Sequence, residues 1–269
     1  MAKRLMQQVR DVIRYKHYSY RTEQSYCYWV KGYIRYHSYK HPAQMGSEEV
    51  IQFLTWLATD RGVSASTQNQ AFSAVLFLYR EVLQKPLENI DAARAKPSQK
   101  IPVVFTRNEV RKIIGHLSNP FLLMVQLLYG SGLRLMEVLR LRIKDIDLHS
   151  ACLIVRNGKG RKDRVTVLPD TLVAPIRQQM AIVQHVFQRD KVNNCHEVWM
   201  PDALARKYPS EARSVHWYYL FPSEKTAIDP YSQKERRHHY SESALHKNVK
   251  NAIRQAGIQK HASCVTAHI

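Results

Sequence analysis

The sequence has few cysteines, few acidic residues and no long apolar run. Its thiols are too far apart for a C-x-x-C pair and stand at Cys27, Cys152, Cys195 and Cys264. This spacing argues against a structural zinc site and a disulfide framework, so we expect reduced thiols and no bound metal. No segment approaches the roughly 18 consecutive apolar residues that a membrane span requires. The first residues also lack the apolar core of a signal peptide, which predicts a soluble, cytoplasmic protein.

The shortage of acidic residues leaves the chain strongly basic. Lysine and arginine total 41 residues against 22 aspartates and glutamates, which gives a formal net charge of +19. Such an excess is typical of proteins that bind nucleic acids, because cationic side chains replace the counterions of the phosphate backbone. With 269 residues and 45% hydrophobic content, the chain is long enough to bury a sizeable core and is expected to form two domains.

Residues 1–88 are predicted to form an N-terminal domain of four helices. Apolar residues recur there at helical spacing in four segments. The segments begin at Leu5, Tyr26, Val50 and Phe72. Ser47 and Ser64 are expected to be the N-caps of the third and fourth helices. Residues 91–102 have little apolar content and two prolines, so residues 89–105 are predicted to form a linker.

Residues 106–269 are predicted to form a mixed α/β domain, so that the protein as a whole is mainly helical. Residues 121–128 are almost entirely apolar and predict a buried helix, and helical periodicity resumes over residues 172–189. Two short strand-like runs, at residues 153–155 and 165–167, flank a basic turn that contains glycine. This pattern predicts a β-hairpin.

The most informative motif is a Gly-x-Gly turn followed by an arginine, in residues 129–137. The turn lets the chain enter a helix abruptly, so Arg134 is expected near the helix N-terminus, where an anion is favoured. Lys159 follows 25 residues later in the basic turn, and the two side chains are candidates to converge on one phosphate. Taken separately, Arg134 and Glu137 also fit a helix salt bridge, and Lys159 fits a solvated turn. The two motifs together favour phosphate binding.

The pattern GLRxxE at residues 132–137, followed by GKGxKxR at residues 158–164, resembles the tyrosine recombinase (phage integrase) family. The resemblance implies a SAM-like core-binding domain ahead of a catalytic domain. It also implies that a tyrosine cleaves one DNA strand through a 3′-phosphotyrosyl intermediate, without a metal or nucleotide cofactor. Arg134 matches the first catalytic arginine of the family, and Lys159 matches the lysine that protonates the leaving 5′ oxygen. Glu137 is expected to be structural and to orient Arg134 or a neighbouring helix.

The segment at about residues 192–223 is similar to the insertion peculiar to integron integrases, which bind folded single-stranded recombination sites as well as duplex sites. By this resemblance, the unpaired bases of the folded site are received by Trp217, Pro230, His238 and His239. Further DNA contacts are expected from the basic residues Arg161, Lys162, Arg164, Arg236 and Arg237. Four adjacent cationic or cationisable side chains at residues 236–239 are costly to bury, which predicts a phosphate nearby.

Each of these residues also has a simpler interpretation. Trp217 fits a core residue, and residues 236–239 fit a solvated basic face. A metal site at the two histidines is not favoured, because no cysteine or carboxylate ligands stand at matching spacing.

Residues 263–269 depart from the family pattern. Aligned without a gap, Val265 occupies the catalytic histidine position and His268 that of the second arginine. A three-residue insertion would instead place His268 on the histidine. Neither alignment supplies the second arginine or the tyrosine nucleophile, so we expect a C-terminally truncated, inactive catalytic domain that is impaired in forming the tetrameric synapse of the family. The apolar faces of residues 121–128 and 172–186 are then expected to be exposed.

Two other functions fit the same residues. An ordinary recombinase of the phage or Xer type would act on duplex DNA and should lack the insertion at residues 198–223. A non-catalytic DNA-binding module would instead occupy recombination sites or repress nearby promoters.

Overall fold

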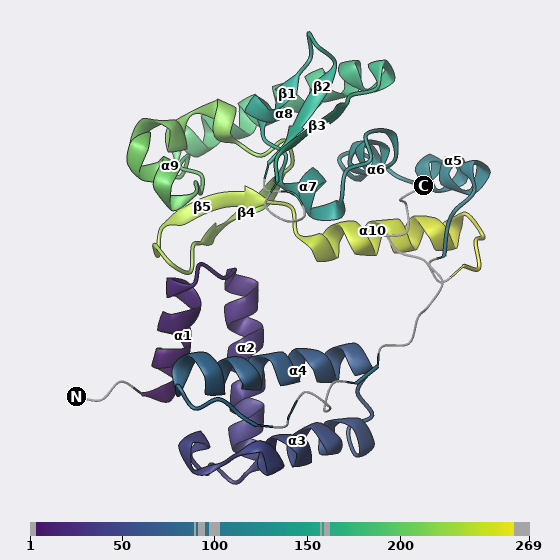
Figure 1. Cartoon of the computed structure of the whole chain (residues 1–269). Coiled ribbons are helices and arrows are strands. Elements are labelled where there is room, and N and C mark those ends of the chain that lie inside the picture. The colour runs from purple at the N-terminus through teal and green to yellow at the C-terminus, as the bar shows by residue number, and fades with distance from the viewer. Residues whose placement is uncertain are drawn as a thin grey trace. The chain divides into compact units, whose positions relative to one another are not determined.

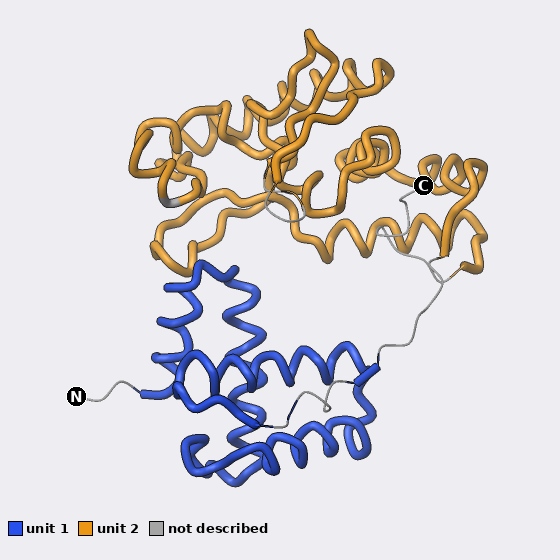
Figure 2. Tube along the Cα trace, in the orientation of Figure 1, with its two compact units in different colours: residues 1–100 blue, residues 101–269 orange. Residues whose placement is uncertain are grey.

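The computed structural model describes residues 4–88, 90, 95–96, 103–156, 158 and 162–260. The chain divides into two compact units, residues 1–100 and residues 101–269 (Figure 2). Each unit has a hydrophobic core of its own. Across the described residues, no helix is both long enough and apolar enough to cross a lipid bilayer. The predicted fold class, mainly helical with small antiparallel sheets in the second unit, is confirmed.

Within its described residues, the first unit is a bundle of four α-helices (Figure 1). They are α1 Leu5–Tyr15, α2 Tyr20–Tyr36, α3 Ser47–Thr59 and α4 Ala65–Phe77, with a 3-10 turn at Pro42–Gln44 and a π-helical turn at Leu78–Val82 after α4. Apolar residues at helical spacing face the inside, as Val9 and Ile13 do on α1. The four predicted helical segments are therefore confirmed.

At the starts of α2, α3 and α4, a side chain accepts a backbone N–H group. Ser64 is the N-cap of α4, as predicted, and its hydroxyl accepts a backbone N–H of the first turn at 3.3 Å. The prediction that Ser47 caps α3 is wrong. Glu49 accepts the N–H of Gly46 at 2.7 Å, so the helix begins one residue earlier. The Ser47 hydroxyl instead donates to the carbonyl of Glu88 at 2.8 Å.

Within its described residues, the second unit combines helices with two small antiparallel sheets (Figure 1). Its helices are α5 Arg107–Gly115, α6 Phe121–Gly130, α7 Leu135–Arg140, α8 Val173–Val192, α9 Asp202–Lys207 and α10 Glu242–Gln255. One sheet has the order β1 Ile146–Asp147, β2 Cys152–Val155 and β3 Arg164–Val167, and the other pairs β4 Pro222–Ile228 with β5 Glu235–His239. Short 3-10 turns lie at Ile143–Asp145, Asp170–Leu172, Pro209–Arg213 and Val215–Trp217.

The β2–β3 hairpin buries apolar side chains from β2 but not from β3, where Val165 and Val167 are 66% and 62% exposed. Val155 pairs with Arg164, and the side chains of Leu153 and Val155 are 0% and 3% exposed. The predicted hairpin is confirmed. The sequence did not predict the β4–β5 hairpin, because residues 235–239 are all charged or titratable and show no apolar alternation.

The apolar face of α6 is buried, and the expectation that it would be exposed is wrong. Its buried residues are Leu123, Met124, Val125, Leu127 and Leu128. The cover comes from within the chain, because α10 packs against α5, α6 and α7. The same expectation for the apolar residues of α8 is met only in part. Ile176 and Val183 are buried, whereas Ile182 is 53% exposed.

Candidate functional site

Arg134 lies at the start of α7, directly after the Gly-x-Gly turn. Gly132 has a φ of +62°, in the left-handed region that L side chains rarely adopt, and this conformation turns the chain from α6 into α7. Arg134 is the N-cap residue of α7, and its backbone N–H donates to Glu137 Oε2 at 2.8 Å. Its side chain is 49% exposed. The predicted place of Arg134 at a helix start is confirmed, and its guanidinium is accessible.

Glu137 is a buried carboxylate shared by two arginines. It accepts from Arg134 Nη1 at 2.9 Å and from Arg164 Nη1 and Nη2 at 2.8 and 2.7 Å. Burial by itself would raise the pKa of Glu137, but the hydrogen bonds from Arg164 and Arg134 outweigh it and lower the pKa to about 2. Glu137 therefore stays ionised and orients Arg134, which is the structural role that the sequence predicted. Arg164, a predicted DNA contact, is engaged by the same carboxylate.

The basic turn between β2 and β3 begins beside this carboxylate. The N–H of Gly158 donates to the carbonyl of Lys162 at 3.0 Å. A Cβ built on Gly158 would lie 3.3 Å from Glu137 Oε1, so there is little room for a side chain. Lys162 is exposed. The predicted site residues Lys159 and Arg161 lie outside the described residues.

Trp217 is a core residue with cations against its ring. Only 8% of it is exposed, and it belongs to a cluster with Val183 and Val198. Lys144 Nζ lies 3.6 Å from the centroid of its ring, and Arg142 Cζ lies 5.1 Å from it. Most of the indole is therefore covered by the protein, in agreement with the core interpretation.

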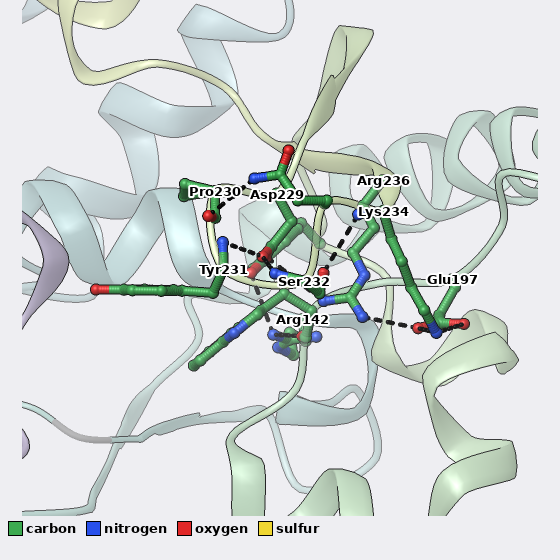
Figure 3. Close-up of polar contacts among 11 residues, drawn as sticks. Arg142, Glu197, Asp229, Pro230, Tyr231, Ser232, Lys234 and Arg236 are labelled. Carbon is green, nitrogen blue, oxygen red and sulfur yellow. Dashed lines mark hydrogen bonds and ion pairs between the residues drawn. The ribbon is translucent and has the colours of Figure 1, made fainter. Parts of the chain in front are cut away.

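Pro230 lies in the turn between β4 and β5, and hydrogen bonds fix this turn (Figure 3). One carboxylate oxygen of Asp229 accepts the N–H groups of Tyr231 and Ser232 at 3.0 and 2.8 Å. Pro230 itself is exposed, and Tyr231 is 48% exposed. The turn therefore presents an exposed proline and a partly exposed ring in a defined backbone conformation.

Arg236 and Arg237 are balanced by carboxylates of the protein itself. Arg236 donates to Glu197 at 2.7 Å and to Asp229 at 3.5 Å (Figure 3). Arg237 is buried, and its Nε and Nη2 lie 2.5 and 2.6 Å from the two oxygens of Asp190. A phosphate is therefore not needed to offset their burial, contrary to the argument from the sequence. That argument failed because the counter-charges come from distant parts of the chain.

His238 and His239 form a cluster of rings with Tyr219. The two imidazole centroids are 4.1 Å apart, and each lies 5.3 Å from the centroid of Tyr219. Desolvation, followed by repulsion from His239 and from nearby arginines, lowers the pKa of His238 to about 4. Desolvation also lowers the pKa of His239. Both imidazoles are therefore neutral near pH 7, which suits stacking on a base better than pairing with a phosphate.

Two residues that the sequence did not assign to the site connect these predicted contacts. Tyr219 touches both histidines, and Arg142 Cζ lies 4.4 Å from the centroid of its ring. Arg142 thereby joins Trp217 to the histidine cluster, whereas Pro230 lies beyond the opposite end of β5. The aromatic run at residues 217–219 was a signal for Tyr219. Nothing in the sequence distinguishes Arg142 from the other basic residues.

Two protein-family models match the chain. Residues 5–89 match "Phage integrase, N-terminal SAM-like domain", and residues 104–268 match "Phage integrase family". An "Integrase/recombinase" of Escherichia coli is 43% identical over 261 residues, which is 97% of this chain and 77% of that protein. "Tyrosine recombinase XerA" of Thermococcus kodakarensis is 27% identical over 236 residues, which is 85% of this chain and 76% of that protein.

Two solved structures share the fold at lower identity. The XerH site-specific recombinase bound to palindromic difH substrate has a TM-score of 0.57 and 16% identity, covering 99% of this chain and 72% of that one. A lambda integrase dimer bound to a COC′ core site has a TM-score of 0.58 and 12% identity, covering 98% of this chain and 67% of that one. At these identities the likeness establishes the fold.

Glu137→Gln tests the role of the carboxylate that Arg134 and Arg164 share. The pKa of Glu137 in the folded protein, about 2, lies below the value of about 4.3 expected in the unfolded chain. A lowered carboxylate pKa stabilises the fold at pH values above the unfolded pKa, and this contribution is lost as the pH falls toward the folded pKa. The variant should therefore lose on the order of 2–3 kcal/mol of unfolding free energy at neutral pH.

Urea unfolding between about pH 5 and pH 2 measures the effect, because the stability of the wild type should fall more steeply there than that of Glu137→Gln. Glu48→Gln removes an exposed carboxylate from α3 and is the matched control. It should keep the steep pH dependence of the wild type. Parallel pH profiles for the wild type and Glu137→Gln would contradict the assignment.

Proposed function

Because the chain belongs to the phage integrase family of tyrosine recombinases, we propose that it is an integron integrase-like protein of site-specific DNA recombination. The observation that carries this proposal is the cluster of neutral rings at His238, His239 and Tyr219 in a protein of net charge +19. Ring surfaces suit unpaired bases, and cationic side chains suit the phosphate backbone. The proposed substrates are folded single-stranded sites with protruding bases, and duplex sites.

In this proposal Arg134 contacts the scissile phosphate. Its guanidinium offers donors in a planar fork, and Glu137 holds it while 49% of the side chain stays exposed. Lys159, in the turn that begins beside Glu137, protonates the leaving 5′ oxygen. Donors fixed in this way stabilise the negative charge that develops on the phosphate oxygens in the transition state.

The remaining predicted DNA contacts fall into groups according to their exposure and their hydrogen-bond partners. Exposed His238 and Pro230 are proposed to meet bases, together with His239. Trp217 is proposed to support Arg142 and Lys144 from the core. Exposed Lys162, together with Arg161, is proposed to meet phosphates. The arginines bonded to carboxylates are proposed to hold the interface in shape, and these are Arg164, Arg236 and Arg237.

We further propose that DNA cleavage by this chain is weak. In the gapless alignment, Val265 stands at the position of the catalytic histidine and His268 at that of the second arginine, so two groups that would stabilise charge on the scissile phosphate are replaced. Val265 and His268, the alternative occupants of the catalytic histidine position, lie outside the described residues. A chain with these replacements would bind recombination sites more readily than it cleaves them.

Binding of a DNA hairpin with unpaired bases should depend on salt. Raising the salt from about 50 to about 200 mM should weaken the affinity by about tenfold or more, because cationic side chains release counterions from the phosphates. Fluorescence anisotropy of a labelled hairpin measures this. An affinity that does not change over this range would refute phosphate binding.

His238→Ala should reduce the preference for unpaired bases. Base stacking contributes about 1–3 kcal/mol per base, so the ratio of affinities for bulged and fully paired hairpins should fall by about fivefold or more. The matched control is His246→Ala, on α10 beside Glu242, and it should keep the ratio of the wild type. Equal affinity of the wild type for the two hairpins would favour a recombinase of duplex sites.

Little covalent protein–DNA adduct should accumulate on a nicked suicide substrate, because Val265 and His268 stand where the gapless alignment calls for the catalytic histidine and the second arginine. Denaturing gel electrophoresis of labelled DNA measures this, with an active tyrosine recombinase on its own site as the positive control. A DNA-linked band that disappears in one Tyr→Phe variant would show that the polypeptide is an active enzyme.

A further inference from the structure

Arg142 is a buried cation whose hydrogen bonds, among the described residues, go to two carbonyls and a hydroxyl. It is 7% exposed. Its Nη1 donates to the carbonyl of Trp217 at 2.5 Å, and its Nη2 donates to the carbonyl of Trp199 at 2.8 Å and to the hydroxyl of Tyr219 at 3.2 Å. Desolvation lowers the pKa of Arg142, so burying this cation costs free energy that the hydrogen bonds must offset. The presence of arginine here therefore points to its geometry, a planar fork that reaches several groups at once.

The groups that Arg142 reaches belong to separate parts of the chain. The carbonyls of Trp199 and Trp217 lie at the two ends of a segment that contains α9, so the guanidinium closes this segment at its base. Backbone bonds extend the connection, because the N–H of Ile143 donates to the carbonyl of Tyr218 at 3.1 Å. Arg142 lies just after α7, the helix that begins at Arg134. It therefore links the proposed catalytic helix to the insertion.

The connection continues from Arg142 to the histidines. Its guanidinium lies over the ring of Tyr219, whose centroid is 5.3 Å from those of His238 and His239. Loss of the fork would free Tyr219 to change its tilt and remove one face of the histidine cluster. His239 is also held by its pairing with Pro222 of β4 and by the bond between its Nδ1 and the carbonyl of Tyr240 at 2.6 Å.

We propose that Arg142 is a positioning residue for base recognition, which holds Tyr219, and through it His238 and His239, in the orientation that stacks on an unpaired base. This inference rests on the proposed function, since it assigns the stacking surface to that function. It differs from a general stabilising role, because it predicts a selective loss. Recognition of unpaired bases should suffer, while binding to the paired backbone should be retained.

Two variants separate geometry from charge. Arg142→Met keeps most of the side-chain length and removes the charge, and Arg142→Lys keeps the charge and removes the fork. The control is Arg156→Met, because Arg156 pairs with Asp145 at 2.8 Å. Thermal unfolding verifies that each variant is folded. If Arg142→Met does not fold, Arg142→Lys carries the test.

Two measurements on the 269-residue chain decide the proposal. In the first, the affinity ratio between a bulged and a fully paired DNA hairpin should fall by about tenfold in both Arg142 variants, or about 1.4 kcal/mol. In the second, NMR titration of the imidazole protons should show the pKa of His238 rising in Arg142→Met, because a repelling charge is lost. Arg156→Met should change neither quantity.

The outcomes distinguish this proposal from the proposed function. Folded Arg142 variants with a wild-type affinity ratio would overturn the positioning role, whatever the histidine titrations show. A wild type without preference for the bulged hairpin would overturn the proposed function. In that case the histidine titrations, which need no DNA, would still decide whether Arg142 controls the surroundings of His238.

Discussion

The buried carboxylate of Glu137 is the constraint on which the proposed phosphate site depends. An ionised carboxylate is stable in a protein interior only when cations and hydrogen-bond donors surround it. Glu137 meets this condition by accepting from Arg134 at the start of α7 and from Arg164 on β3, while Gly158 lies against it. One charge therefore fixes the helix start, the hairpin and the beginning of the basic turn relative to one another.

The basic residues of this protein fall into groups with different roles. Some are bonded to carboxylates or carbonyls of the protein, among them Arg142, Arg164, Arg236 and Arg237. Others, such as Lys162, are exposed. A net charge of +19 therefore does not measure how many side chains are available to phosphates. The neutral ring of His238 adds a surface of another kind within the basic segment, suited to bases by its lack of charge.

Predictions from the sequence succeeded where the signal was local. Apolar periodicity located the helices of the first unit, since each helix must bury one face. Two strand-like runs around a basic turn that contains glycine located the β2–β3 hairpin. The β4–β5 hairpin was missed because its strand at residues 235–239 has no apolar alternation and is held by ion pairs instead. Ser47 was misplaced because a capping serine and a serine in the first turn look alike in sequence. The cover of α6 was missed because α10 comes from more than a hundred residues further along the chain.

The sequence by itself determined the family motifs, the excess of basic charge and the place of Arg134 at a helix start, because these follow from composition and from neighbouring residues. Tertiary structure alone decided that Trp217 is covered, that Arg237 is neutralised by Asp190, and that the pKa of His238 is lowered to about 4. Asp190 and Arg237 are 47 residues apart in the chain. Burial and electrostatic partners depend on distance in space, and the distance between residues far apart in sequence is set only when the chain has folded.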